Sequence, residues 1–571
     1  MRMARAGLWS VAAWMAACGG TPGDEGTKPP APPAETPTYT VKGTVSGLAG
    51  ELTLQLNGQE RLTRAADGPF AFESRLENQT EYTVGVLGAP AEQDCAVEGG
   101  TGRVAGADVE SVRVRCAAKT YALGGTVEGA RGAPTLTLGT ETLALPVDGR
   151  FTFTTRLPRG GTYEVRLDNP VPGLRCTLDK GSGRVAGAVE DITVRCHDWY
   201  TLATHAAARG VLGQADFTHR AAERGGPTGA GTLNGPLGSA VVVDARLYVP
   251  DRGAHRVLGF SPVPPLPGAD AGWVLGQTDF TADVPGTSDL KLNQPAGLGG
   301  AGTRLAVADQ RNSRVLLYTP PPPLSATPAT LVLGQEGFDT SAFGCTPRTL
   351  GFPQGVFLSR DKVLVADTGN HRVLVWNTPP TTNGQPADLV LGQQDFTHCR
   401  RNDANGDGTS ESKPGPTTLY NPTSVWTDGQ RLAVVDSFNN RVLVWNTFPT
   451  THGQPADVVL GQRDFTTSTA GLSATAMDNP TAVTSTGAQL FVADTLNHRV
   501  LVWNTWPLTS DTPPDRVLGQ ADFTHNDRED PPTGNTPSAR SLFEPSGVTL
   551  AWPHVVVTDS ANHRVLLFAS E

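Results

Sequence analysis

Basic runs, helix-forming residues and long apolar segments are scarce in this 571-residue sequence. Lysine and arginine together number 45 against 56 acidic residues, and no basic run is longer than two residues. Because phosphate binding needs a clustered basic footprint, the net charge of −11 disfavours nucleic acid as a partner. The low content of Lys, Glu and Met, beside 65 Gly and 46 Pro, favours many short strands joined by turns over helical bundles.

The N-terminus, MRMARAGLWSVAAWMAACGG, places two Arg before an apolar stretch of about ten residues. This length is typical of a secretory signal and is too short for a membrane-spanning helix. Residues 15–19, Met-Ala-Ala-Cys-Gly, resemble the lipobox of bacterial lipoproteins, which implies a signal peptide over residues 1–18 and lipidation of Cys18. An ordinary signal peptide with an incidental Cys is the alternative.

The lipobox resemblance also implies a cellular location. Several acyl chains on Cys18 would hold the protein stably on a membrane. Gly19 stands where many inner-membrane lipoproteins have Asp, so the resemblance implies the outer membrane of a bacterial cell envelope, on a side that stays open. Residues 19–38, GGTPGDEGTKPPAPPAETPT, lack apolar periodicity and predict a disordered, extended tether.

Six cysteines remain after Cys18, an even number that predicts three disulfides in an oxidising compartment. In two tandem segments, one Cys lies about twenty residues before the last, a loop that a bridge can close. The predicted pairs are Cys95 with Cys116, Cys176 with Cys196, and Cys345 with Cys399.

A tandem repeat fills residues 39–117 and 118–197, where GTGRVAGADVESVRVRC is matched by GSGRVAGAVEDITVRC. Short alternating segments such as ELTLQL, broken by Gly, Asn and Asp, predict two small antiparallel β-sandwiches. The copies resemble the immunoglobulin-like spacers of bacterial surface proteins, which implies a role in extending and presenting another domain.

A second repeat fills residues 198–571. The segment VLGQ begins at 211, 274, 332, 390, 459 and 517, and each copy is followed by a loop of variable length, a Pro phrase and two strands. Strands such as VLVAD and RVLVWN are apolar at nearly every position, so both of their faces are expected to be buried. Middle strands of propeller blades are buried in this way, which predicts an all-β fold with a six-bladed β-propeller after the two sandwiches.

The propeller region resembles the NHL-repeat β-propellers. The signature stands as Asn-His-Arg at residues 370–372, 497–499 and 562–564, with looser copies at 254–256, 312–314 and 439–441. The first VLGQ strand would complete the blade that the C-terminal strands begin, which closes the ring and hides both edge strands. The resemblance implies a binding or structural scaffold.

An Asp precedes an Arg by five positions in every unit, on either side of a four-residue turn. A charge-assisted Asp–Arg bridge is expected to fix the turn and cap the sheet edge, because a catalytic pair would not need six copies. These structural pairs are Asp251/Arg256, Asp309/Arg314, Asp367/Arg372, Asp436/Arg441, Asp494/Arg499 and Asp559/Arg564. The His residues in these turns are not expected to share a metal, since equivalent turns are spread around the ring.

One variable loop contains NDANGDGTSE, which fits the start of a calcium-binding loop with oxygen ligands at alternate positions. Asp403, Asn405 and Asp407 are the candidate ligands, and Glu411 is the candidate substitute for the closing Glu, because Pro414 occupies that position of an EF-hand loop. A plain polar loop is the alternative. No other cofactor is expected.

Familiar catalytic signatures are also absent: the sequence has no G-x-S-x-G turn, P-loop or Cys-x-x-Cys pair. We therefore predict no catalytic residue and a non-enzymatic envelope protein whose variable loops bind a protein, peptide or glycan. The alternative is a metal-dependent propeller lyase or lactonase-like hydrolase. That alternative predicts His and carboxylate side chains converging on one metal at the channel mouth.

Overall fold

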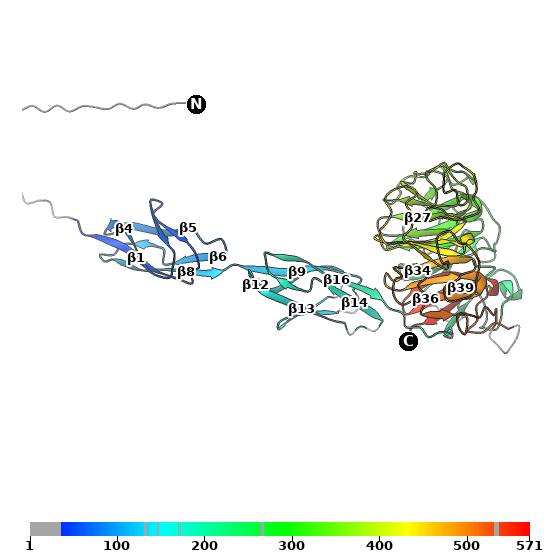
Figure 1. The fold of residues 1–571 in the computed structure, drawn as a ribbon, viewed down its shortest axis with the longest axis horizontal. Coiled ribbons are helices and arrows are strands. Elements are labelled where there is room, and N and C mark those ends of the chain that lie inside the picture. The colour runs from blue at the N-terminus through cyan, green and yellow to red at the C-terminus, as the bar shows by residue number, and fades with distance from the viewer. Residues whose placement is uncertain are drawn as a thin grey trace, which may run out of the picture. The chain divides into compact units, whose positions relative to one another are not determined.

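The computed structural model describes residues 36–571 except 131–133, 146–147, 170, 172, 264–267 and 530–535. Cys18, the signal peptide and most of the predicted tether lie outside the described residues. The described chain forms β-strands and short 3-10 turns, and none of its helices is long and apolar enough to span a membrane (Figure 1). The all-β prediction is confirmed.

The first tandem repeat forms two four-stranded sheets, ordered β4-β1-β8-β6 and β3-β2-β5-β7. Val41, Leu54, Phe72, Val84 and Val112 come from both sheets and share one buried core, which explains the alternation in the sequence. The strands are β1 (Thr38–Ser46), β2 (Leu52–Leu56), β3 (Glu60–Arg64), β4 (Gly68–Glu77), β5 (Glu81–Gly88), β6 (Gln93–Glu98), β7 (Thr101–Arg103) and β8 (Val109–Ala118).

The second repeat copies this topology with sheets β12-β9-β16-β14 and β11-β10-β13-β15. Its strands are β9 (Thr120–Glu128), β10 (Thr135–Leu138), β11 (Glu141–Ala144), β12 (Gly149–Pro158), β13 (Thr162–Asp168), β14 (Leu174–Asp179), β15 (Ser182–Arg184) and β16 (Val189–Asp198). Disulfides join Cys95 to Cys116 and Cys176 to Cys196 across directly paired strands, as predicted.

The prediction of purely antiparallel sandwiches is wrong at one strand pair in each repeat. β1 runs parallel to β8, with Val45 opposite Val114, and β9 runs parallel to β16, with Val127 opposite Val194. The first and last strands of a repeat are joined by the whole module, and so long a connection permits parallel pairing. Alternating polarity along a strand reports burial on one face and carries no information about the direction of its neighbour.

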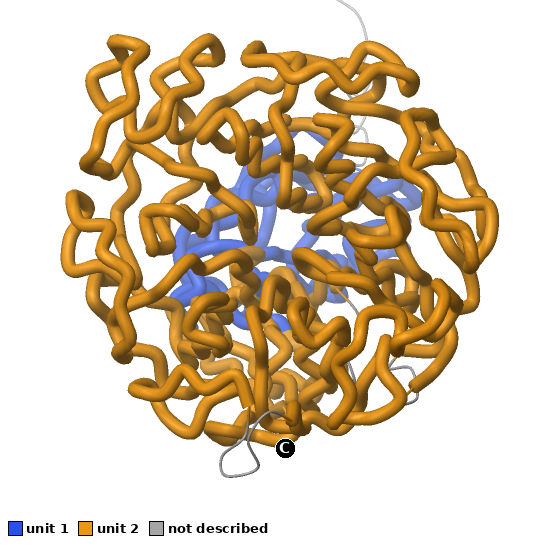
Figure 2. Tube along the Cα trace, turned by 90° about the vertical axis from the view of Figure 1, so that its right-hand side faces the viewer, with its two compact units in different colours: residues 1–122, 156–162, 184–188 blue, residues 123–155, 163–183, 189–571 orange. Residues whose placement is uncertain are grey.

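Contacts between residues divide the chain into two compact units (Figure 2). One unit holds the described residues up to Ala122 together with Arg156–Thr162 and Arg184–Ala188. The other holds Leu123–Thr155, Tyr163–Gly183 and Val189–Glu571. The second tandem repeat therefore contributes residues to both units.

Residues 210–569 form six four-stranded sheets among the described residues. We number them in chain order: sheet 1 is β18–β21, sheet 2 is β22–β25, sheet 3 is β26–β29, sheet 4 is β30–β33, sheet 5 is β34–β37, and sheet 6 is β38–β40. Sheet 6 is completed by β17 (Gly210–Leu212), which pairs antiparallel with the last strand of the chain. The predicted closure by the first VLGQ strand is confirmed.

The second, third and fourth strands have similar lengths in all six sheets, whereas the first strands range from 3 to 7 residues. Their strands are β18 (Val241–Val243), β19 (Arg246–Asp251), β20 (Arg256–Phe260), β21 (Trp273–Leu275), β22 (Pro295–Ala301), β23 (Arg304–Asp309), β24 (Arg314–Tyr318), β25 (Leu331–Leu333), β26 (Gly355–Leu358), β27 (Val363–Asp367), β28 (Arg372–Trp376), β29 (Leu389–Leu391), β30 (Pro422–Thr427), β31 (Leu432–Asp436), β32 (Arg441–Trp445), β33 (Val458–Leu460), β34 (Pro480–Ser485), β35 (Leu490–Asp494), β36 (Arg499–Trp503), β37 (Arg516–Leu518), β38 (Pro545–Ala551), β39 (His554–Asp559) and β40 (Arg564–Ala569). Short 3-10 turns are η1 (Ala222–Gly225), η2 (Gln310–Asn312), η3 (Thr368–Asn370), η4 (Ser437–Asn439), η5 (Thr495–Asn497) and η6 (Ser560–Asn562).

The first strands of successive sheets contact one another in a closed cycle, from β18 through β38 and back to β18. Six apolar cores lie between neighbouring sheets, each built from the middle strands of both. β27 and β28 are buried at every position, as the unbroken apolar sequence predicts. This arrangement is that of a β-propeller.

Candidate functional site

All six predicted Asp–Arg pairs form ion pairs, with Arg Nε 2.6–2.8 Å from Asp Oδ2. In each sheet the Asp ends the second strand, the Arg begins the third, and the two residues pair directly in the ladder, as Asp367 and Arg372 do. The turn residue directly before the Arg, such as His371 with φ of 55°, adopts the left-handed conformation that reverses the chain.

The pairs are fully buried, with neither side chain exposed to solvent. In sheet 3, Arg372 Nη1 donates to the carbonyl of Phe396 at 2.7 Å, and Nη2 donates to the carbonyls of Thr346 and Thr349 at 2.9 and 3.0 Å. Phe396 lies in the loop that follows the sheet, and the two Thr lie in the loop that precedes it. Each Arg therefore fastens its own turn to two variable loops, which explains its burial.

The Asp side chain also has several hydrogen-bond partners. Asp367 Oδ1 accepts from the Gly351 amide at 2.6 Å, and Oδ2 accepts from Asn370 Nδ2 at 2.8 Å as well as from Arg372. Burial raises the pKa of Asp367, and Arg372 and the hydrogen bonds oppose that effect. Asn370 is the Asn of the Asn-His-Arg signature, so this residue supports the ion pair.

The His of the signature has a different partner. His371 Nδ1 accepts from the amide of Asn421, which immediately precedes the first strand of sheet 4. The same bond joins His255 to Gln294, His498 to Glu544 and His563 to Gly235, and Asn440 Oδ1 makes the equivalent bond to Asn479. Burial lowers the pKa of His371 to about 4, and the neighbouring Arg401 and Arg400 act in the same direction. These His side chains join one sheet to the next.

The Asp–Arg turns and the variable loops lie at the same end of the sheets, which we call the Asp–Arg end. Gln393, the Gln of a VLGQ segment, donates to the carbonyl of His371 in the turn and to the carbonyl of Arg400 in the loop, at 3.0 and 2.8 Å. The turns and the variable loops therefore share one end. Seven of the exposed large apolar side chains that the structure describes belong to this end: Val284, Leu290, Phe343, Phe352, Phe438, Leu472 and Leu496.

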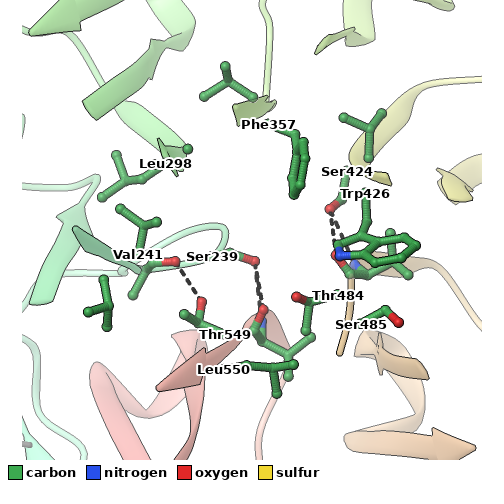
Figure 3. Close-up of a pocket in the computed structure, with 18 residues that line it drawn as sticks. Ser239, Val241, Leu298, Phe357, Ser424, Trp426, Thr484, Ser485, Thr549 and Leu550 are labelled. Atoms are coloured by element: carbon green, nitrogen blue, oxygen red, sulfur yellow. Dashed lines mark hydrogen bonds between the residues drawn. The ribbon is translucent and has the colours of Figure 1, made fainter. Parts of the chain in front are cut away.

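A cavity of about 270 Å³ lies among the first strands of all six sheets, toward the opposite end (Figure 3). Ser239 and Ser424 donate from its wall to carbonyls of neighbouring sheets, and Phe357 and Trp426 supply aromatic rings. None of the described residues that line it is acidic, basic, His or Cys. The metal-dependent alternative predicted such groups at the channel, and this wall does not offer them.

The predicted calcium loop lies between sheets 3 and 4. Asp403 is 2% exposed, and its two oxygens accept from the amides of Gly406, Asp407 and Gly408 at 2.9–3.2 Å. Asn405 and Asp407 are exposed, with Oδ1 of Asp407 accepting from Thr409. Glu411 is joined to Arg401 through their backbones. The described residues contain no group of three or more His, Cys, Asp or Glu side chains placed to hold a metal, so calcium here stays a prediction.

The third predicted disulfide joins Cys345 to Cys399. These residues lie in consecutive variable loops of the Asp–Arg end, 54 positions apart in the sequence. The bond therefore links the loop before sheet 3 to the loop after it. Three disulfides in one chain indicate an extracellular or periplasmic protein.

One repeat of the propeller region is similar to a known repeat family. The NHL repeat model matches residues 350–376. The match covers β26, β27, η3 and β28, with the Asp367–Arg372 pair inside it. Because the other five sheets repeat the same turn and ion pair, the findings support an NHL-type β-propeller.

Other similarities are distant. A trans-enoyl reductase, phmE, from Phaeosphaeria nodorum is 28% identical over 173 residues, which is 30% of this chain and 43% of the reductase. The chain therefore spans less than half the length of this curated relative.

Two solved structures overlap a larger share of the chain. An auxiliary nutrient binding protein from Bacteroides thetaiotaomicron covers 77% of this chain and 91% of its own, at 11% identity and a TM-score of 0.35. A virginiamycin B lyase from Staphylococcus aureus covers 60% of this chain and 97% of its own, at 10% identity and a TM-score of 0.30. At these scores neither overlap carries weight for function.

Proposed function

We propose that this protein is a non-enzymatic binding scaffold of a bacterial cell envelope, with its ligand held at the Asp–Arg end. The observation that carries the proposal is the contrast between the two parts of each repeat. Strands, ion pairs and turn geometry recur in every sheet, whereas the loops at one end differ in length and sequence and expose apolar side chains. Variable loops on a rigid scaffold are where binding usually resides.

In this proposal, the six sheets are the blades of one NHL-type propeller, and the two tandem repeats at 39–117 and 118–197 are immunoglobulin-like spacers that present it. Residues 1–18 are a lipoprotein signal peptide, lipidated Cys18 attaches the chain to the outer membrane, and residues 19–38 form the tether. The three disulfides support export. The partner is a protein, peptide or glycan of the envelope, and the acidic net charge argues against nucleic acid.

Lipid attachment is tested by the intact mass of the membrane-extracted protein. We expect the mass of a chain that begins at Cys18 and carries acyl groups, and we expect Cys18→Ala to remove both the added mass and the membrane attachment. An unmodified N-terminus in the wild-type protein would contradict this part of the proposal.

Binding is tested by co-sedimentation of the detergent-solubilised full chain with isolated envelope material depleted of lipid. We expect saturable binding that Phe343→Ala and Phe438→Ala weaken. Leu324→Ala and Leu508→Ala are the controls, because these side chains, 69% and 67% exposed, lie in loops at the opposite end. Equal effects of the two sets of variants, or no saturable binding, would reject the Asp–Arg end as the site.

The second candidate function is a metal-dependent lyase or hydrolase. The cavity wall among the first strands lacks the titratable side chains that this chemistry needs. The sequence has a G-x-G-x-x-G spacing at residues 297–302, but these residues lie in and directly after β22 and are followed by β23, whereas dinucleotide binding needs a helix there. The scaffold is therefore the better-supported function.

A further inference from the structure

Four aromatic side chains surround the turn of sheet 3 at the Asp–Arg end. The rings of Phe343 and Phe352 lie 5.5 Å apart, and those of Tyr420 and Phe438 lie 5.1 Å apart. Phe343, Phe352 and Phe438 are 53%, 39% and 47% exposed. Large apolar side chains with this exposure on a folded protein mark contact sites when they gather in one place.

Gly369 lies between the two aromatic pairs. A Cβ atom at Gly369 would approach the ring of Phe343 at 3.2 Å. His371, two residues further along the turn, has its ring centre 5.4 Å from that of Tyr420. The equivalent turn position holds Phe438 in sheet 4 and Leu496 in sheet 5. The same Cβ at Gly369 would approach the carbonyl oxygen of Gly351 at 2.8 Å, so glycine at this position permits the close packing of Gly351 and Phe343 against the turn.

Guanidinium groups accompany both aromatic pairs. Arg311 lies 5.8 Å from the ring centre of Phe352, and Arg401 lies 4.9 Å from that of Tyr420 and donates to its hydroxyl at 2.8 Å. Neither Arg forms an ion pair with a carboxylate among the described residues, and Arg400 adds a further positive charge near His371. Three guanidinium groups therefore lie near these rings and the turn of sheet 3. We call Phe343, Phe352, Tyr420, Phe438, Arg311 and Arg401 the aromatic–arginine surface.

The Cys345–Cys399 disulfide holds this surface in shape. Cys345 is two residues from Phe343, and Cys399 is two residues from Arg401, so the bond ties together the loops that supply the two halves. Loops that are already fixed lose less conformational entropy when a ligand binds. The position of the propeller disulfide is therefore explained by the surface that it supports.

We propose that the aromatic–arginine surface binds an acidic polysaccharide, a polymer of uronic acids. This inference rests on the proposed binding function and names its ligand class. The C–H face of a pyranose ring carries slight positive charge and stacks on the electron-rich face of an aromatic ring. A guanidinium beside that ring can bind the uronate carboxylate with two parallel hydrogen bonds. Two guanidinium groups, each beside an aromatic ring, give this surface positive charge that complements a polyuronate.

The test uses the full chain in detergent and two probes, polygalacturonate, which is charged, and galactan, which is neutral. Affinity electrophoresis in gels containing either polymer gives the dissociation constants. We expect wild-type protein to bind polygalacturonate more tightly than galactan, and binding to weaken with added salt. Arg401→Gln and Phe438→Ala should each weaken binding about tenfold or more, as expected for the loss of a charge-assisted contact or a stacking ring.

Matched control variants come from sheets 5 and 6. Leu508→Ala removes an apolar side chain that is 67% exposed in the loop between β36 and β37, away from the Asp–Arg end. Arg528→Gln removes a guanidinium that lies 4.9 Å over the ring of Phe543. Both should bind like wild type. Arg401→Lys, which keeps the charge but loses the planar fork, should bind with intermediate strength. Unchanged unfolding midpoints for all variants separate binding from misfolding.

Three results would overturn the proposal. These are no binding of polygalacturonate by the wild-type chain, equal losses in the control variants, and tighter binding of a single-stranded oligonucleotide, whose bases and phosphates satisfy the same groups. If polygalacturonate fails while Phe438→Ala still weakens binding to envelope material, the ligand class is wrong and the scaffold function stands. If both kinds of binding fail, the scaffold function is wrong as well.

Discussion

The buried Asp–Arg pair of sheet 3 leads to a quantitative prediction about stability. Asp367→Ala would leave Arg372 charged, fully buried and without its carboxylate. Removing one partner of a buried ion pair costs about 3–5 kcal/mol. The Gly351 amide and Asn370 Nδ2 lose their acceptor at the same time. We therefore expect the free energy of unfolding to fall by an amount at the upper end of that range.

Replacing both members of the pair is the sharper test. Buried ion pairs can often be exchanged for apolar residues at no cost. Here, Asp367→Leu combined with Arg372→Met would leave the carbonyls of Thr346, Thr349 and Phe396 without their donors. Each unsatisfied buried group costs about 1–3 kcal/mol, so the double variant should also lose about 3 kcal/mol or more.

Urea unfolding followed by tryptophan fluorescence measures this loss in the propeller, because no Trp lies between residues 15 and 198. Arg463→Ala is the control, since the Arg463 side chain is 84% exposed beside Asp464, and such surface pairs contribute at most about 1 kcal/mol. A double variant as stable as wild type would refute the view that the Arg fastens the loops. So would a loss below about 1 kcal/mol for Asp367→Ala.

Two further predictions concern the links between sheets. Because the folded-state pKa of His371 is about 4, below its ordinary value of 6.5, protonation favours the unfolded chain. Its stabilising contribution is complete above pH 6.5 and declines as the pH falls toward 4, by at most about 3 kcal/mol. His371→Asn should keep the bond to the Asn421 amide, because Asn440 makes the equivalent bond to Asn479. The variant should show a smaller pH dependence of stability in unfolding experiments from pH 4 to 7. An unchanged pH profile would contradict the role of His371. Replacing Cys345 and Cys399 by Ser should increase amide hydrogen exchange in the two loops, residues 339–351 and 396–411. Exchange in β27 and β28 should stay unchanged. Equal protection of the loops in the variant and the wild type would show that the disulfide does not hold them.

The sequence predicted the repeated elements of this fold well. Six copies of one phrase showed which residues pair, because an Asp and an Arg five positions apart flank the same turn each time. Unbroken apolar strands such as β27 indicated burial on both faces. The burial of the pairs was missed, because the carbonyls that Arg372 binds are backbone groups in loops of differing sequence. Backbone partners leave no signal in side-chain patterns.

Long-range partners were missed for the same reason. His371 binds an amide 50 positions away, and nothing in the residue type of Asn421 indicates this bond. The aromatic–arginine surface joins Phe343 to Phe438 across two variable loops and a turn. One signal was present, since Phe438 stands in a turn whose equivalent position is Gly369 in the preceding sheet. A departure from the repeat at an exposed position is a useful indication of a binding residue.

The metal content of the full chain, measured by elemental mass spectrometry after dialysis without chelator, tests the central claim of a non-enzymatic scaffold most directly. We predict no stoichiometric zinc or other transition metal. Calcium that is lost in the Asp403→Asn and Asp407→Asn variants would be compatible with the scaffold and would confirm the predicted calcium loop. One tightly held zinc per chain, retained in those variants, would contradict the scaffold and favour the lyase or hydrolase.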